Sequence, residues 1–335
     1  MNKILTVTLN PAIDVRYNVE KLDTGNINRT ISIEKNAGGK GINVSRIIKK
    51  LGGDVLATGI VGGHTGKLFL SKLDKDGIKN NFIKTDFETR TCIAVIDKST
   101  GKITELLESA EGKEKDFENF LKKYISILES GVKLVCGSGS ILNGIQKDSY
   151  NILINEASKR GIKFILDTSG DTLIKGIEAK PFLIKPNQDE LEDMFNKKFS
   201  TVNEIIEAAR KIVKKGVKNV MVTLGGNGAV LVTENEVYRA FLPKVEIKNT
   251  VGSGDSVIGG FAHGISEGKS LRESFKLGIA CGTTNAMLET TGSIDLKILN
   301  NIYDFRKNFP ICSTSIIIDR GYLRKISNKW RYYNG

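Results

Sequence analysis

Short apolar runs rich in β-branched residues alternate with amphipathic stretches along most of the chain. Such runs lie at 4–9, 132–135, 164–166, 182–184 and 220–224, and the last four each precede a charged segment with helical spacing. Between residues 113 and 130, apolar side chains recur every three or four positions from Phe117 to Leu128, as on a helix with one buried face. A second such helix follows Thr201. The alternation predicts βαβ units on a parallel sheet.

Four further strand-like runs break this rhythm, because no helical stretch separates them from their natural partners. They lie near 12–19, 29–36, 90–97 and 102–108. We expect these runs to form a small separate sheet beside the main domain, where it would serve as a lid over a cleft.

The composition is that of a globular protein with a substantial core. Of 335 residues, 40% are apolar and 26% charged, and the formal net charge is +12. Such a charge suits nucleic acid, an anionic membrane or small phosphorylated substrates. The lysines are spread along the chain without interleaved aromatic residues, and no run of about 18 apolar residues occurs. We therefore expect neither nucleic-acid binding nor a membrane span.

The spacing of the cysteines and the first residues of the chain indicate the cellular compartment. Four cysteines lie far apart without a CxxC pair, which argues against a zinc site or a disulfide framework. The first residues lead into a strand-like run and lack the apolar segment of a signal peptide. A cytoplasmic location is therefore expected.

The strongest chemical signal is the loop at 250–256, which opens a stretch with helical spacing. Gly252 and Gly254 allow backbone N–H groups to converge at a helix N-terminus, where an anion such as a phosphoryl group is favoured. Asp255 would then lie beside that anion and could accept a proton from an attacking hydroxyl. The alternative is a tight turn in which Asp255 is only a carboxylate of the first helical turn.

A second glycine-rich turn lies at 37–44 and also opens a helix. It is neither a Walker A loop nor a dinucleotide fingerprint, because it lacks the terminal Lys-Ser/Thr pair and does not show GxGxxG. Lys40 and Asn43 could bind a sugar phosphate and its hydroxyls. The alternative is a flexible connection with a solvated lysine.

Two weaker signals follow predicted strands. After the run at 182–184, Asn187 and Glu190 stand three apart at a helix start, where Glu190 could hold magnesium through water or the pair could form a capping box. After the run at 220–224, Gly225 and Gly228 could let the backbone approach a nucleotide, or could form a hairpin turn.

Five motifs in this order resemble the phosphofructokinase B family of ribokinase-like sugar kinases. They are Thr8-Leu9-Asn10-Pro11 with Asp14, residues 38–44, Thr89-Arg90, residues 185–190 and residues 252–255. The resemblance covers about residues 1–295. It implies an α/β fold, a Rossmann-type three-layer sandwich with a small β-sheet lid, within a kinase domain at 1–313. Residues 314–335 match nothing in the family pattern and are expected to be an appended tail, a packing element or an interaction patch.

The resemblance also implies cofactors, partners and roles for individual residues. ATP and Mg²⁺ would be the cofactors, a small phosphorylated sugar the substrate, and a homodimer would form through the lids. Asp255 would be the base, with Gly252 and Gly254 in the anion hole. The substrate residues would be Asp14, Gly38, Gly39, Lys40, Asn43 and Arg90, with Arg29 assisting from the lid. The ATP site would be lined by Lys185, Thr223, Gly225, Gly228 and Ser253, with Asn285 near the adenine, while Asn187 and Glu190 would organise magnesium through water.

Within the family, the chain most resembles the tagatose-6-phosphate kinases, on residues 89–95 and 104–108. The 1-phosphofructokinases usually carry an asparagine soon after the Thr-Glu pair, where this chain has Leu107 and Glu108. The expected function is therefore ATP-dependent phosphorylation of tagatose 6-phosphate, with fructose 1-phosphate as the alternative substrate. A further alternative is a non-catalytic sugar-phosphate sensor, because Leu142 stands where the family usually has proline.

Overall fold

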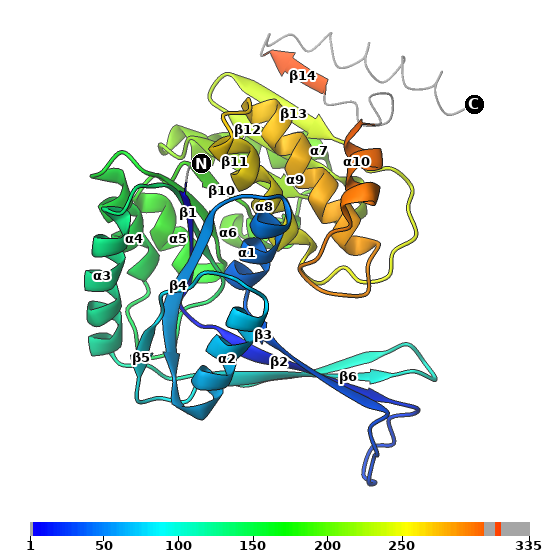
Figure 1. Cartoon of the computed structure of the whole chain (residues 1–335). Coiled ribbons are helices and arrows are strands. Elements are labelled where there is room, and N and C mark those ends of the chain that lie inside the picture. The colour runs from blue at the N-terminus through cyan, green and yellow to red at the C-terminus, as the bar shows by residue number, and fades with distance from the viewer. Residues whose placement is uncertain (1–2, 305–311, 316–335) are drawn as a thin grey trace.

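A single large sheet forms the centre of the main domain (Figure 1). The computed structural model describes residues 3–304 and 312–315. The sheet order is β14-β13-β12-β11-β10-β9-β8-β1-β4-β5, parallel from β11 to β5 and antiparallel from β11 to β14. Its strands are β1 Lys3–Thr8, β4 Val55–Gly62, β5 Ile83–Thr85, β8 Val132–Ser138, β9 Lys163–Asp167, β10 Leu183–Ile184, β11 Asn219–Thr223, β12 Ala229–Thr233, β13 Glu236–Ala240 and β14 Cys312–Ser315.

Helices cover both faces of this sheet, which gives the predicted three layers. One apolar layer joins the sheet to α1, α8, α9 and α10, and a second joins it to α3, α4, α5, α6 and α7. The predicted apolar face of α3 is buried, since Phe117, Phe120 and Tyr124 are almost fully inaccessible. The helices of the two layers are α1 Lys40–Lys50, α8 Ser253–Ser266, α9 Leu271–Ala286 and α10 Leu296–Asp304, then α3 Glu114–Leu128, α4 Ser149–Ser158, α5 Gly170–Glu178, α6 Gln188–Phe195 and α7 Val202–Lys214.

A second, four-stranded sheet projects from the main domain, as the sequence predicted (Figure 1). Its order is β3-β2-β6-β7, and we call it the lid. A third apolar cluster packs the base of the lid against α2 Gly63–Lys75. The lid strands are β2 Ala12–Val19, β3 Ser32–Gly38, β6 Arg90–Asp97 and β7 Ile103–Leu107.

Two boundaries differ from the expectation. Strand β3 begins at Ser32 rather than near residue 29, because the preceding connection is held in its own loop by Asn28, which donates to the carbonyl of Asp23 at 2.8 Å. The expected boundary between 313 and 314 falls inside β14, which pairs with β13. The rest of the expected tail, 316–335, lies outside the described residues.

Candidate active site

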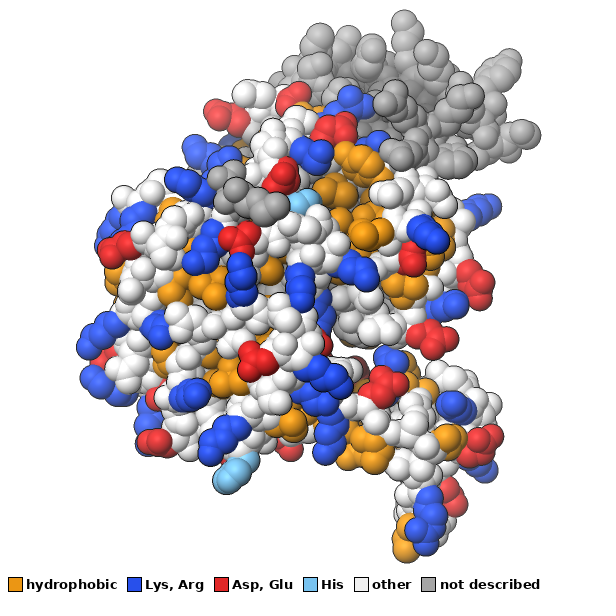
Figure 2. Space-filling view, viewed as in Figure 1, with side chains coloured by type: hydrophobic (Ala, Val, Ile, Leu, Met, Phe, Trp, Pro, Cys, Tyr) orange, Lys and Arg blue, Asp and Glu red, His pale blue; other side chains and the backbone are white. Residues whose placement is uncertain are grey.

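A large cavity lies where the carboxyl ends of the parallel strands meet the base of the lid. Its volume is about 1060 Å³, and Figure 2 shows the molecule hollowed between main body and lid, with Lys and Arg side chains beside the opening. This edge of a parallel sheet is where α/β proteins place their ligands. The predicted site residues that line the cavity are Asp14, Gly39, Lys40, Asn43, Arg90, Lys185, Asn187, Glu190, Thr223, Gly252, Gly254 and Asp255.

The loop before α8 has the geometry that its glycines predicted. Gly252 is the N-cap residue of α8 in the left-handed conformation, with φ 78°. A side chain there would have its Cβ 2.9 Å from the backbone nitrogen of Gly292, so the loop closes tightly at this point. The helix begins at Ser253, whose N–H donates to the Thr250 carbonyl at 3.2 Å. Gly254 and Asp255 follow in the first turn, where N–H groups have no partner within the helix, and both residues line the cavity. This helix end can therefore bind an anion.

Asp255 lies in the first turn of α8 and is buried, with 6% of its surface exposed. Its carboxylate accepts a hydrogen bond of 2.8 Å from the side-chain amide of Asn43. Burial raises the pKa of Asp255 above its ordinary value, and the negative charge of Asp167 raises it further. The hydrogen bond from Asn43 and the cations of Lys40 and Lys185 oppose this rise. A carboxyl group held this way can exchange a proton near neutral pH.

The second predicted loop brings another helix N-terminus to the same cavity. Gly39, with φ 111°, precedes α1. A Cβ at Gly41 would lie 2.3 Å from the side-chain oxygen of Thr8, so the glycine lets α1 pack directly on β1. The ammonium group of Lys40 lies 3.9 Å from the carboxylate of Asp167, and that charge raises the pKa of Lys40. Lys40 is therefore a stable cation at the N-terminus of α1.

The lid contributes Asp14 and Arg90. Asp14 lies over Gly38, where any Cβ would overlap its carboxylate. Solvent reaches Asp14 through the cavity, yet the protein packed around it raises the pKa of its carboxyl group, while Arg46 and Arg90 lower it. Arg90 donates to the carbonyl of Asn10 at 3.3 Å, which fixes its guanidinium at the base of the lid.

Asn187 and Glu190 form the capping box that the sequence left as an alternative. The backbone nitrogen of Glu190 donates to the Asn187 side chain at 2.7 Å, and that of Asn187 donates to the Glu190 carboxylate at 2.8 Å. Both residues also line the cavity, so the two interpretations are compatible. Within residues 3–304 and 312–315, no three His, Cys, Asp or Glu side chains are grouped closely enough to bind a metal directly.

Several predicted residues lie elsewhere. Arg29 lies on the exposed connection between β2 and β3, outside the cavity lining. Gly225 and Gly228 belong to the hairpin between β11 and β12, as the alternative predicted, and a Cβ at Gly228 would meet the carbonyl of Ala240 at 2.0 Å. The amide of Asn285 is fully buried and donates to Ser253 at 3.1 Å, so these two residues brace the loop before α8.

Sequence reasoning missed Asp167, which ends strand β9 at the floor of the cavity. The residue is 1% exposed, and its carboxylate lies 3.2 Å from the ammonium group of Lys185. The signal was available, because an acidic residue directly after a buried parallel strand lies at the ligand-binding edge of the sheet. Asp167 thus forms ion pairs with both Lys40 and Lys185 near Asp255.

Comparisons with known proteins agree with this architecture. A 1-phosphofructokinase of Borreliella burgdorferi is 41% identical over 286 residues, covering 85% of this chain and 92% of the relative. A 1-phosphofructokinase of Bacillus subtilis is 36% identical over 293 residues, covering 87% and 94%. The crystal structure of phosphofructokinase-2 from Escherichia coli in complex with potassium matches with a TM-score of 0.86 at 30% identity, covering 91% of this chain and 99% of that one.

Fold and relatives together define a sugar kinase. The family model described as "pfkB family carbohydrate kinase" matches residues 1–296, and the chain belongs to this family. The predicted ribokinase-like sandwich with a lid is therefore confirmed. Sugar kinases of this family use ATP with Mg²⁺. The cavity suits both groups, since it offers two helix N-termini, the ammonium groups of Lys40 and Lys185 and the carboxylate of Glu190. Among the described residues, no helix is long and apolar enough to cross a bilayer.

Proposed function

We propose that this kinase transfers the γ-phosphoryl group of ATP to the C6 hydroxyl of fructose 1-phosphate, giving fructose 1,6-bisphosphate and ADP. The observation that carries phosphoryl transfer is the buried Asp255 carboxylate at the N-terminus of α8, inside a cavity with basic side chains. The choice of sugar is supported by two relatives named 1-phosphofructokinase, each aligned over more than four fifths of this chain.

In this proposal each cavity residue has a definite task. Asp255 accepts the proton of the attacking hydroxyl, whose oxygen bonds to the γ-phosphorus as the bond to ADP breaks. The N–H groups of Gly252 and Gly254 stabilise the charge on the transferring phosphoryl group. Bound with ATP, Mg²⁺ would neutralise charge on the phosphate oxygens, held through water by Asn187 and Glu190.

The sugar phosphate would lie between α1 and the lid. Lys40 and Arg90 would bind its phosphate, and Asp14 and Asn43 would bind its hydroxyls. Gly38 leaves room for the Asp14 carboxylate, and Gly39 lines the cavity beside Lys40. Lys185 and Thr223 would contact ATP on the opposite side of Asp255. This division places the reacting hydroxyl beside the carboxylate.

The substrate order proposed here reverses the one expected from the lid strands. That expectation rested on residues 89–95 and 104–108, and on Leu107 and Glu108, which stand where the 1-phosphofructokinases usually carry an asparagine. The Glu108 carboxylate accepts a hydrogen bond of 2.6 Å from the backbone of Thr91, and Leu107 is 64% exposed at the end of β7. Likeness in two short lid segments weighs less than similarity along most of the chain.

The sensor alternative loses its main support in the structure. It rested on Leu142, which replaces a family proline. Leu142 is 1% exposed and packs in the apolar core, with its Cδ1 atom 2.9 Å from a Cβ placed at Gly112. Leu142 therefore belongs to the apolar core and is not among the residues that line the cavity.

The substrate is tested by an ADP-release assay with fructose 1-phosphate, tagatose 6-phosphate and fructose 6-phosphate at matched concentrations. We expect kcat/KM for fructose 1-phosphate to exceed the others by at least about tenfold, as one misplaced polar group in a hydrogen-bonding pocket costs that much or more. A higher kcat/KM for tagatose 6-phosphate would reject this choice of sugar while leaving the kinase assignment intact.

We further propose that two copies of the chain pair through their lids. The lid carries exposed apolar side chains on its outer strands, including Ile33 at 53%, Ile103 at 52% and Leu106 at 58% exposure. Exposed large apolar side chains on a projecting sheet are typical of an interaction surface rather than of solvent-facing structure. A second lid offers a surface of the same size and character.

A charge placed on this surface tests the pairing. We expect Leu106→Lys, at an exposed position outside the cavity lining, to shift the protein from dimer to monomer in size-exclusion chromatography with light scattering, because an ammonium group would be buried at the interface. Leu296→Lys is the matched control, since Leu296 is 42% exposed on α10, away from the lid. A dimer that persists in Leu106→Lys at micromolar concentration would contradict the lid interface.

A further inference from the structure

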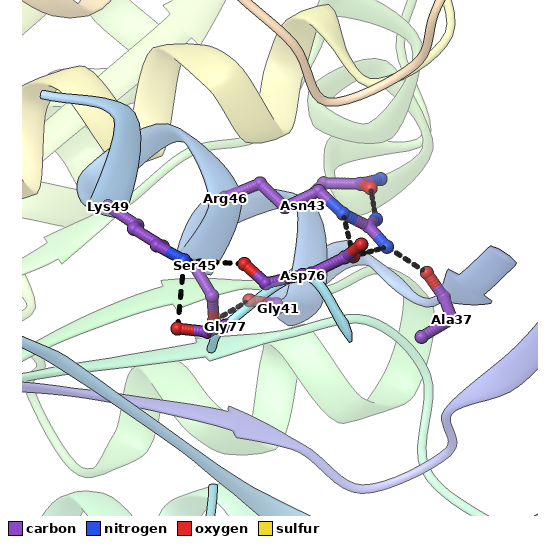
Figure 3. A network of polar contacts seen from close by, with 8 residues as sticks. All are labelled: Ala37, Gly41, Asn43, Ser45, Arg46, Lys49, Asp76 and Gly77. Atoms are coloured by element: carbon purple, nitrogen blue, oxygen red, sulfur yellow. Dashed lines mark hydrogen bonds and ion pairs between the residues drawn. The ribbon is translucent and has the colours of Figure 1, made fainter. Parts of the chain in front are cut away.

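Arg46 connects three elements around the cavity, although no motif pointed to it. It lies on α1, and its guanidinium donates to the Asp76 carboxylate at 2.8 and 3.0 Å, to the Ala37 carbonyl at 2.7 Å and to the Asn43 side-chain oxygen at 3.2 Å (Figure 3). The side chain is 21% exposed. A planar guanidinium with donors in fixed directions is suited to holding several acceptors at once.

The contact with Asn43 determines which end of its amide faces Asp255. An asparagine side chain has one carbonyl oxygen and one NH₂ group. Because Arg46 binds the oxygen, the NH₂ group points to Asp255 and donates at 2.8 Å. A rotated amide would set its oxygen against the carboxylate and its NH₂ against the guanidinium, and both contacts would be repulsive.

The other contacts of Arg46 reach the lid and helix α2. Ala37 is in the last part of lid strand β3, two residues before the N-cap of α1, and Asp76 is the C-cap residue of α2. The Arg46 guanidinium therefore links the base of the lid, at Ala37, to Asn43, the residue that donates a hydrogen bond to Asp255. A shift of β3 would move Asn43 through two hydrogen bonds, from Arg46 to Ala37 and from Arg46 to Asn43.

We propose that Arg46 is a positioning residue. It orients the Asn43 amide toward Asp255 and couples that orientation to strand β3 at the base of the lid. The inference rests on the proposed function, since it takes Asp255 as the base. Arg46 does not contact the reacting atoms in this scheme. It acts through Asn43, at the opposite end of the amide from Asp255.

The first test is the pH profile of kcat for the full-length chain with fructose 1-phosphate and ATP. The hydrogen bond from Asn43 lowers the pKa of Asp255, whose other charged neighbours are Asp167, Lys40 and Lys185, while Asp76 and Asp14 lie near Arg46. In Arg46→Met we expect the acid limb to move to higher pH and kcat to fall by about tenfold or more. An acid limb at the wild-type pH would overturn the proposal.

Arg46→Lys separates geometry from charge and guards against a misfolded Met variant. Lysine keeps the cation but cannot hold three acceptors in one plane. We expect its acid limb to move in the same direction as in Arg46→Met. If Arg46→Lys has the wild-type profile, the charge alone is responsible and the positioning role is rejected.

A double-mutant cycle then asks whether Arg46 acts through Asn43. In an Asn43→Ala background we expect Arg46→Met to change kcat by less than about twofold, because the amide it orients is absent. Additive losses would overturn the proposal. Should Asp255→Asn retain turnover, the proposed function fails instead, so the two failures are distinguishable.

Lys49 supplies the matched control. It lies three residues after Arg46 on the same helix and donates to the carbonyl groups of Asp76 and Gly77, without contacting Asn43 (Figure 3). Lys49→Met loosens the same turn of α2, and we expect kcat and its acid limb to stay within about twofold of wild type. If Lys49→Met reproduces the Arg46→Met profile, docking of α2 is the cause and the proposal is wrong.

Discussion

Asp255→Asn is expected to lower kcat by about a thousandfold or more, while ATP binding is retained. Asparagine has nearly the shape of aspartate and can still accept the hydrogen bond from Asn43, but it cannot take a proton from the attacking hydroxyl. The measurement is steady-state kcat with calorimetric titration of ATP. Near-normal turnover in this variant would refute Asp255 as the base.

The stability of the same variant separates lost chemistry from lost structure. The folded protein raises the pKa of Asp255 above its ordinary value, so the ionised carboxylate is less favourable in the folded than in the unfolded state. This cost is present at pH values above the raised pKa. A neutral asparagine removes it, so the thermal midpoint of Asp255→Asn at pH 8 should equal or exceed that of wild type.

Asp295→Asn is a suitable control for this experiment. Asp295 accepts hydrogen bonds from the backbone of Lys297 and Ile298 at the start of α10, and asparagine caps helices equally well. We expect its kcat to stay within about twofold of wild type. A comparable loss in both variants would indicate a general effect of removing an acidic side chain.

The sheet and the lid could be predicted from sequence because their signals are local. Strands β1, β8, β9, β10 and β11 contain the short apolar runs of the sequence, whereas β4 and the Ile-Lys-Thr strand β5 were not predicted. The change from βαβ rhythm to adjacent strands indicated the lid. The start of β3 could not be predicted, since the connection before it is fixed by side-chain contacts of Asn28 that leave the hydrophobic pattern unchanged. Local turns of this kind depend on geometry rather than on periodicity.

The site was predictable in its motifs but not in its contacts. Asn43 and Asp255 each stood in a recognisable loop, yet the hydrogen bond that joins them spans 212 positions of sequence. Arg46 and Asp76 are ordinary surface residues in the sequence, and they acquire meaning only when α1 and α2 are packed together. Asn285 was expected near the adenine from the family pattern, but its hydrogen bonds to Val251 and Ser253 could not be predicted from the sequence. Polar networks between distant elements are decided by tertiary packing.

The second large effect concerns the backbone at the start of α8. Gly252→Ala places a Cβ 2.8 Å from the side chain of Thr291 and 2.9 Å from the nitrogen of Gly292, so the loop must shift. The N–H groups proposed to face the phosphoryl group then move with it. We expect kcat to fall by about a hundredfold to a thousandfold, the usual cost of losing one such donor.

Gly268→Ala controls for backbone strain at the other end of the same helix. Gly268 has φ 75°, close to the 78° of Gly252, but a Cβ there meets nothing within 4 Å. Both variants carry the strain of a left-handed alanine, about 1–2 kcal/mol. Gly252→Ala should therefore lose at least as much stability in thermal unfolding as Gly268→Ala, because it adds a steric clash, while kcat of Gly268→Ala stays within about twofold of wild type. Equal kcat losses in the two variants would show that strain in α8, rather than displacement of its N–H groups, limits phosphoryl transfer.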